Sequence, residues 1–154
     1  MCRPITFLAL AVAVAAGCGS MTSPSNVPVR VTVQPGETLA GGPDTATFTL
    51  RVENITPSMV DLTFPSSCQV LPYFVDRGTG QAVTPLGGGF ACAAVITHQA
   101  LDPRASFSQV VTVTAGDGPV AGRIVLPPGT YGIYARLEDS MYKVQSDQLQ
   151  FTVR

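Results

Sequence analysis

Short runs in which apolar and polar residues alternate limit most strongly what this chain can fold into. In residues 46–52, ATFTLRV, the apolar side chains occupy every second position. A period of two places such side chains on one face of a β-strand, whereas a helix has a period of about 3.6. The same alternation predicts strands at 27–33, 60–64, 107–113, 131–137 and 149–153, with weaker strands at 69–76 and 93–99.

Clusters of Gly, Pro and Asp separate these runs, as in QPGETLAGGPD, DRGTG and AGDGPVAG. Short strands joined by such turns are typical of antiparallel folds with two packed sheets. No segment with a useful length of helical period follows residue 18. We therefore expect an all-β fold, an immunoglobulin-like antiparallel β-sandwich of about seven to nine strands.

Tyr131 provides a local test of this architecture. It follows Gly129 at the start of a predicted strand, in PPGTYGIYA. This position is typical of a tyrosine corner, in which the hydroxyl bonds to the backbone of the preceding connection. The alternative is that Tyr131 is simply an aromatic residue of the core.

The N-terminal apolar run, residues 5–16, is uncharged and follows a single positive charge at Arg3. A membrane-spanning helix needs about 20 apolar residues, so this run is too short to cross a bilayer and instead has the pattern of a secretory signal peptide. Its end, AAGC at 15–18, resembles the bacterial lipobox, which implies removal of residues 1–17 and attachment of lipid to Cys18. The alternative is ordinary cleavage after an A-x-A site, which would leave Cys18 as a plain thiol.

Residues 18–28 are small, polar and proline-bearing, which predicts a flexible tether to a single domain at 29–154. The chain has nine Lys+Arg against ten Asp+Glu, and its only lysine is Lys143. Because no basic cluster is available for nucleic acid or anionic lipid, membrane attachment must come from the acyl chains. We expect an exported protein anchored in the bacterial cell envelope. In a cell with two membranes, Gly19 after the lipidated cysteine favours the outer one.

The chain has four cysteines, of which Cys2 leaves with the signal peptide and Cys18 takes the lipid. The other two, Cys68 and Cys92, are expected to pair, because thiols outside the cytoplasm usually form disulfides. A metal or redox pair is the alternative, although the chain has no C-x-x-C motif and one histidine. We expect no metal site and no cofactor.

From Phe48 to about Leu137, the order of short motifs resembles the BsuPI-type intracellular proteinase inhibitor domain. The motifs are FTLRVENIT, VDLTFPSSCQ, YFVDRGTGQAV, LDPRASF and LPPGTYGIYARL. The chain departs from the family in having no tryptophan and in reading Pro-Arg at 103–104. The resemblance implies an immunoglobulin-like sandwich, also found in exported bacterial lipoproteins, that inhibits a protease. The matching positions are Asn54, Leu62, Phe64, Asp76, Gly80, Leu101, Pro103, Gly129 and Tyr131.

The segment from Thr84 to Cys92, TPLGGGFAC, is the loop on which we expect a partner or a protease to bind. The proposed disulfide would restrain one end of the loop, and Phe90 would present an apolar anchor. Glycines 87–89 loosen the same loop, so a flexible connection that touches nothing is the alternative. The candidate binding residues are Thr84, Pro85, Leu86 and Phe90.

No combination of residues typical of catalysis is found, and we expect a protein that is not an enzyme. The single histidine, His98, lies in a predicted strand, and no G-x-S-x-G motif is present. Glu138 and Asp139 are the sole adjacent carboxylates and are expected to form a solvated turn. Residues 54–56, NIT, fit a glycosylation sequon, but the expected role of Asn54 is a turn in which it bonds its own backbone.

Two classes of function follow from these observations. In the first, the domain is a non-enzymatic interaction module on a lipid tether that binds an unidentified protein, with a protease as the partner that the family resemblance implies. In the second, the domain is a structural or assembly component of the envelope whose sheet edges or faces dock to neighbouring proteins.

Overall fold

The computed structural model describes residues 27–36 and 45–154, so the predicted signal peptide, Cys18 and nearly all of the predicted tether lie outside the described residues. In the described ranges the backbone forms ten strands and no helix, and hence no helix able to cross a membrane. The strands are β1 (Val29–Pro35), β2 (Thr45–Asn54), β3 (Val60–Phe64), β4 (Val70–Asp76), β5 (Ala82–Val83), β6 (Thr97–Leu101), β7 (Ser106–Ala115), β8 (Ile124–Leu126), β9 (Gly129–Leu137) and β10 (Leu149–Val153).

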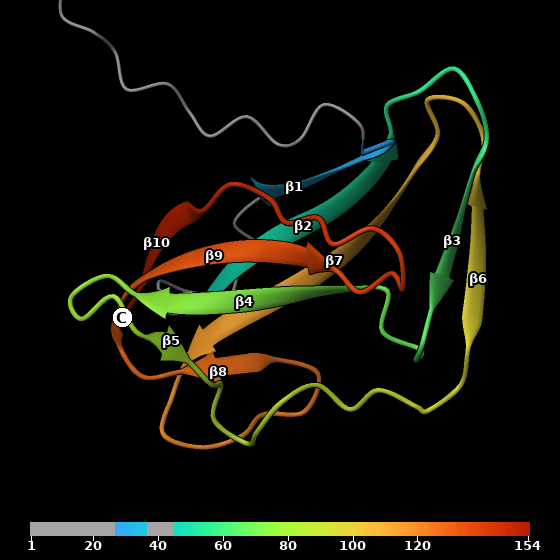
Figure 1. Cartoon of the computed structure of the whole chain (residues 1–154). Helices are drawn as coiled ribbons and strands as arrows, with labels where there is room; N and C mark the ends of the chain where they lie inside the picture. The colour runs from blue at the N-terminus through green and yellow to red at the C-terminus, as the bar shows by residue number, and fades with distance from the viewer. Residues whose placement is uncertain (1–26, 37–44) are drawn as a thin grey trace, which may run out of the picture.

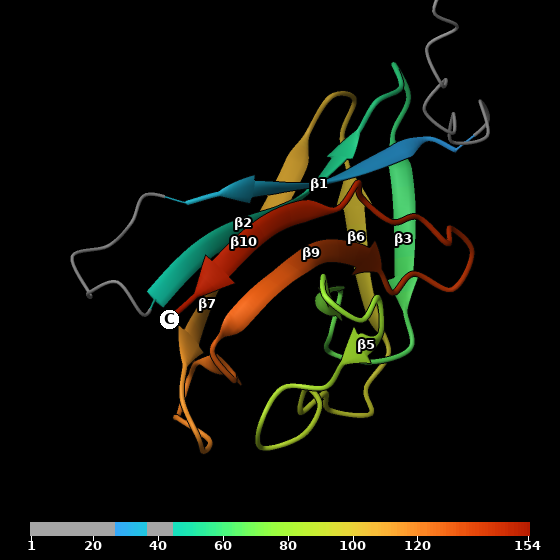
Figure 2. The ribbon, with the colours of Figure 1, turned by 90° about the vertical axis from the view of Figure 1, so that its left-hand side faces the viewer.

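Two four-stranded sheets pack against each other as a β-sandwich (Figures 1 and 2). Their strand orders are β1-β2-β7-β8 and β10-β9-β4-β5. These orders place β7 beside the first two strands and β4 beside the last two, as strands A, B, E and C, F, G are placed in immunoglobulin domains. The predicted all-β sandwich is thus confirmed. The short β7–β8 pairing is parallel and departs from the antiparallel pattern.

The core lies between the two sheets and follows the alternation of the sequence. In β2, Phe48, Leu50 and Val52 are buried, and the residues between them are partly exposed. Phe151 of β10 meets them from the opposite sheet, with its ring centroid 4.9 Å from that of Phe48. The same alternation of burial occurs in β3 and, on the predicted face, in β9. The predicted core faces of these strands are therefore confirmed.

A third sheet, of β3 and β6, stands beside one end of the sandwich (Figure 1). β6 begins at Thr97, later than the predicted start at residue 93, because its partner β3 ends at Phe64, which pairs with Thr97. Two other strands have no predicted counterpart. The two-residue β5 and the three-residue β8 are too short to show a period in the sequence.

Tyr131 forms the predicted tyrosine corner. Its hydroxyl donates a hydrogen bond to the C=O of Pro127 at 2.8 Å, in the connection that precedes β9. Its ring is buried in the core and lies 5.9 Å from the ring of Phe151, so both interpretations of this residue hold. Burial of the phenol raises the pKa of Tyr131 above its ordinary value. The corner fixes the point at which the chain crosses from one sheet to the other.

The prediction that Glu138 and Asp139 form a solvated turn is wrong. Asp139 is 1% exposed, and its Oδ1 accepts hydrogen bonds from the N–H groups of Met141 and Tyr142 at 2.8 and 2.7 Å. Its Oδ2 accepts the N–H of Thr63 in β3 at 2.6 Å. The carboxylate therefore stands where another strand would pair with β3. Burial is favourable here because three backbone donors replace water.

Asn54 makes the predicted bond to its own turn and several more. Its Oδ1 accepts the N–H of Thr56 at 2.9 Å, and its Nδ2 donates to the C=O groups of Ser58, Leu101 and Asp102 at 2.7, 3.0 and 3.0 Å. The side chain is fully buried and joins the end of β2 to the end of β6. In the folded domain this asparagine is not accessible to a glycosylating enzyme.

Candidate binding surface

The predicted binding loop is fixed near its start to a strand of the opposite sheet. The N–H of Leu86 donates to the C=O of Val125 in β8 at 2.9 Å, so the half-buried Leu86 serves as an attachment point. The N–H of Gly88 donates to the C=O of Pro85 at 3.1 Å and closes the next turn. Gly87 and Gly88 have φ angles of 92° and 99°, a left-handed conformation that glycine adopts at little cost.

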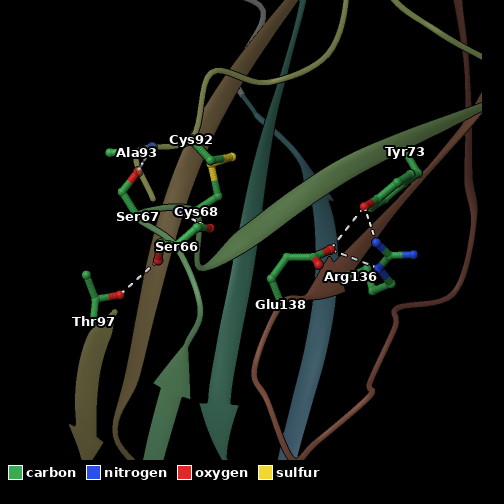
Figure 3. The surroundings of a disulfide bond; sticks show 9 residues. All are labelled: Ser66, Ser67, Cys68, Tyr73, Cys92, Ala93, Thr97, Arg136 and Glu138. Carbon is green, nitrogen blue, oxygen red and sulfur yellow. Dashed lines mark hydrogen bonds and ion pairs between the residues drawn. A yellow bond between two sulfur atoms is a disulfide. The ribbon is translucent and has the colours of Figure 1, made fainter. Parts of the chain in front are cut away.

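The far end of the loop is held by the predicted disulfide, which is confirmed. Cys68 and Cys92 are bonded, with their Cα atoms 5.4 Å apart (Figure 3). Next to them, the N–H of Ser67 donates to the C=O of Ala93 at 3.0 Å, and the N–H of Ala93 donates to the Oγ of Ser67 at 2.8 Å. The loop is therefore attached at both ends, by one backbone hydrogen bond near its start and by a covalent bond at its end.

Between these attachments the loop lies beside β4 and borders a shallow hollow of about 300 Å³. Thr84, Pro85 and Phe90 line the hollow, so three of the four predicted binding residues come together there. Leu71 and Tyr73 of β4 form part of the opposite wall. Phe90 is half-buried and does not stand out as the apolar anchor that the sequence predicts. The Phe90 side chain instead forms part of the wall of the hollow.

A cluster of two tyrosines and an ion pair extends this surface across β4 and β9. Figure 3 shows three of its four members, Tyr73, Arg136 and Glu138. Tyr73 and Tyr134 pair directly across the two strands, and their rings stack with centroids 5.4 Å apart. The guanidinium of Arg136 lies 4.3 Å from the centroid of the Tyr73 ring, within the range of a cation–π interaction. Glu138 Oε1 accepts hydrogen bonds from Arg136 Nε at 2.8 Å and from the Tyr73 hydroxyl at 3.0 Å.

The charges of this cluster follow from its contacts. Burial raises the pKa of the Tyr73 phenol, and the hydrogen bond to Glu138 raises it further. The hydrogen bond to the same carboxylate raises the pKa of Arg136. The Tyr73 phenol is thus neutral at neutral pH, and it lies beside the Arg136–Glu138 ion pair.

The tyrosine cluster has only a weak signature in the sequence. The available signal was that Tyr73 and Tyr134 lie at the outward-facing positions of two alternating strands, where polar residues are usual. Aromatic residues at outward-facing positions mark a contact surface when they gather in one patch. Their pairing could not be known before the register of β4 and β9 was known.

A larger concavity lies elsewhere on the described chain. It is a groove of about 710 Å³ between β1 and residues 143–149, and it contains none of the predicted binding residues. Its walls include the side chains of Val27, Val33 and Leu149 and the polar Gln145. Its lining also includes the charged Arg30, Lys143 and Asp147, but no aromatic residue.

Three polar residues of types found in catalytic sites, His98, Ser140 and Lys143, each make a hydrogen bond to a neighbouring strand or turn. His98 is exposed on β6 and shares a 3.1 Å hydrogen bond with the hydroxyl of Thr63. Ser140 and Lys143 have the S-x-x-K spacing of some acyl-transfer enzymes, but Lys143 Nζ donates to the C=O of Asp139 at 2.7 Å. Residues 27–36 and 45–154 contain no group of three or more His, Cys, Asp or Glu placed to hold a metal ion.

No known family model matches this sequence, and no curated protein matches it. Among solved structures, the β-glucosidase EmGH1 of Erythrobacter marinus is similar over 80% of this chain, with 15% identity and a TM-score of 0.38. A β-glucosidase of Kluyveromyces marxianus in complex with glucose is similar over 82% of this chain, with 12% identity and a TM-score of 0.39. The matched part is 16% and 14% of those two chains. Likeness at this level gives no ground for assigning their activity to this chain.

Proposed function

We propose that this chain is a non-enzymatic protein of the bacterial cell envelope, anchored by lipid on Cys18, whose β-sandwich binds a partner protein. The binding site is the loop–tyrosine surface, defined as residues 84–90 together with Tyr73, Tyr134 and Arg136. One observation carries the proposal: the loop is attached at both ends beside a hollow that is bordered by aromatic side chains.

Attachment at both ends lowers the entropy that the loop loses when a partner binds, which favours affinity. Tyrosine and arginine also supply much of the binding energy at protein interfaces, because they combine large apolar area with directed hydrogen bonds. On this surface the Tyr73 ring is already fixed between Tyr134 and Arg136. Little side-chain ordering is therefore left to occur on binding.

Site-specific photo-crosslinking in living cells tests the partner. A photoreactive phenylalanine analogue placed at Phe90 or Tyr134 of the full-length protein should capture a distinct protein. The matched control is Val110, which is 64% exposed on β7 in the other sheet and should capture nothing in common with them. Identical products from all three positions, or none from Phe90 and Tyr134, would contradict the assignment of the surface.

Inhibition of a protease is the narrower form of this proposal, supported by the resemblance to the BsuPI-type domain and by the doubly attached loop. Serine proteases assayed with the purified protein at micromolar concentration should include at least one that it inhibits. Phe90→Ala and deletion of glycines 87–89 should weaken that inhibition. Inhibition unaffected by either change would remove the loop from the mechanism, and no inhibition at all would leave only the broader binding role.

The lipid anchor is tested separately from the binding surface. Cys18→Ser should abolish incorporation of radiolabelled palmitate and leave a precursor that retains residues 1–17. The Cys68–Cys92 disulfide supports export, because such bonds persist in oxidising compartments. A mature protein that begins beyond Cys18, or that carries no lipid, would refute the anchor without affecting the loop–tyrosine surface.

A structural or assembly role in the envelope is the second candidate, and it is favoured by β6, which pairs with β3 on one side and with no described strand on the other. The crosslinking experiment separates the two roles. Capture of a single protease would support the inhibitor role, whereas capture of several envelope components would support the assembly role.

A further inference from the structure

The sheet edges of this domain are protected in different ways, and β6 differs from the rest. The edge of β8 receives a hydrogen bond from Leu86, and β5 is only two residues long. β1 carries the charged Arg30 and faces the start of β10 across the 710 Å³ groove. The outer edge of β3 is closed by Asp139 and by the N–H of Ser140, which donates to the C=O of Thr63 at 2.8 Å.

β6 pairs with β3 on one side and with no described strand on the other. In Figure 1 it stands at the right-hand limit of the molecule. The direction of its backbone groups follows from Thr63, whose N–H and C=O both bond away from β6, to Asp139 and Ser140. The backbone N–H and C=O groups of Leu62 and Phe64 must then point toward β6, because successive residues of an antiparallel strand direct these groups to opposite sides.

The partners of Leu62 and Phe64 in the register are Gln99 and Thr97, which consequently use their backbone groups within the β3–β6 pair. The N–H and C=O groups of His98 and Ala100 then point to the open edge. Only one of these four groups has a protein contact in the described chain, a 3.4 Å approach of the Gln99 side-chain amide to the C=O of Ala100. The edge thus offers two donors and two acceptors to another strand.

Side chains do not protect this edge. From residue 91 to residue 101 the sequence, ACAAVITHQAL, contains no Asp, Glu, Lys, Arg or Pro. Natural proteins commonly place such residues on open edges to prevent pairing with another chain. Just before the strand, Val95 and Ile96 are 50% and 66% exposed, and His98 and Ala100 are also exposed. The uncovered backbone is therefore accompanied by uncovered apolar side chains.

We infer that β6 pairs antiparallel with β6 of a second copy of this chain, which joins two β3–β6 sheets into one four-stranded sheet across a two-fold axis. With His98 opposite His98 of the second copy, the outward backbone groups of the two strands face one another. Ile96 then lies opposite Ala100 of the second copy, apolar against apolar. A two-fold contact of this kind uses the same patch on both copies.

The charge pattern is the reason to assign the second strand to this same chain. An isologous pair brings each residue near its own copy, so any charge near the axis meets a like charge. Residues 91–101 have none. The first charge beyond them, Asp102, lies opposite Ala94 of the second copy in this register. The edge is thus free of the repulsion that would oppose self-pairing.

The mass of the full-length protein, extracted in detergent and measured by native mass spectrometry over a range of dilutions, tests this inference. The wild-type protein should be a dimer that dissociates on dilution. His98→Lys and His98→Glu should each be monomeric at concentrations where the wild type is dimeric, because like charges would face each other across the axis. An equimolar mixture of the two variants should recover a dimer containing one copy of each.

Both His98 variants lose the same exposed hydrogen bond to Thr63, so recovery in the mixture cannot arise from that loss. The control variants are Val110→Lys and Val110→Glu, at an exposed position on β7 in a different sheet, and they should leave the dimer unchanged. A wild-type protein that is monomeric throughout would overturn the inference and leave the edge for a different protein. So would a dimer that persists in both single variants, or a mixture that stays monomeric.

Discussion

Two long connections of this sandwich are fixed in opposite ways. The β9–β10 connection, residues 138–148, is held by the buried carboxylate of Asp139, which accepts three backbone N–H groups. The β5–β6 connection, residues 84–96, is held by a disulfide near one end and a strand contact near the other. The exposed glycines 87–89 lie between those two attachments.

The difference lies in what each attachment leaves free. The Asp139 carboxylate specifies a local conformation, because its three donors converge only when the connection is folded against β3. A disulfide limits the separation of two points in both the folded and the unfolded chain, but it does not fix the residues between them. The β9–β10 connection is therefore part of the framework. The β5–β6 connection can change conformation between its attachments without disturbing that framework.

Removal of the Asp139 carboxylate should have the largest effect. Asp139→Ala leaves three backbone N–H groups without their acceptor and opens the edge of β3, so the free energy of unfolding should fall by about 3–5 kcal/mol. Urea unfolding followed by circular dichroism measures this loss. The matched control is Asp147→Ala, an exposed residue of the same connection, which should change stability by less than about 0.5 kcal/mol. Equal effects of the two substitutions would show that the carboxylate does not hold the connection.

Loss of the disulfide should be the next largest effect. Cys68→Ser together with Cys92→Ser should lower the melting temperature by about 6–12 °C, for a loss of about 3 kcal/mol. Calorimetry of the wild-type protein with and without a reducing agent should give the same shift. Amide hydrogen exchange should accelerate around residues 91–97 and stay unchanged around 138–143. Two titratable thiols in the native, unreduced domain would contradict the pairing.

These two connections also show how far the sequence predicts the structure. Pairing of Cys68 with Cys92 could be predicted because elimination left no other partner for either cysteine. Burial of Asp139 could not, because it depends on β3 lying beside the connection, which is a contact between distant parts of the chain. A carboxylate next to Glu138 has the local pattern of a solvated turn. Only the distant donor, the N–H of Thr63, reverses that interpretation.

The strands and the candidate surface also differ in how far they can be predicted from the sequence. Alternation predicts the faces of β2, β3 and β9, because it reports which side meets the core. Alternation does not predict which strands pair, so it could not predict the stacking of Tyr73 with Tyr134. Thr84, Pro85 and Phe90 could be placed in one loop from sequence. The half-buried position of Phe90 could not, since it depends on β4 beside the loop.

The tyrosine corner is a third kind of attachment, made by one hydroxyl. Tyr131→Phe removes its 2.8 Å hydrogen bond to Pro127 and keeps the ring in the core, so stability should fall by about 0.5–1.5 kcal/mol. Tyr134→Phe, which removes a hydroxyl with no hydrogen bond among the described residues, is the control and should change stability less. Chemical denaturation of both variants measures the difference. A Tyr134 effect as large as that of Tyr131 would show that the corner contributes no specific stability.

The β4–β5 turn provides the smallest expected effect, because its carboxylate also binds backbone donors but does so in solvent. Oδ1 of Asp76 accepts the N–H groups of Gly78 and Thr79, each at 2.8 Å, and these bonds lower the pKa of Asp76 below its ordinary value of 3.8. A lowered folded-state pKa contributes stability above the unfolded-state value, and that stability is lost as the pH falls through the folded-state pKa.

Asp76→Asn keeps the acceptor oxygen but removes the charge. The variant should therefore be slightly less stable than the wild type at neutral pH, and the difference should vanish in acid below the folded-state pKa. Thermal melts of both proteins from neutral pH into that acid range measure the gap. Curves that stay parallel over the whole range would mean that the charge on Asp76 adds nothing to stability. Solvent exposure would then cancel the stabilisation that backbone N–H groups give to a carboxylate when it is buried, as Asp139 is.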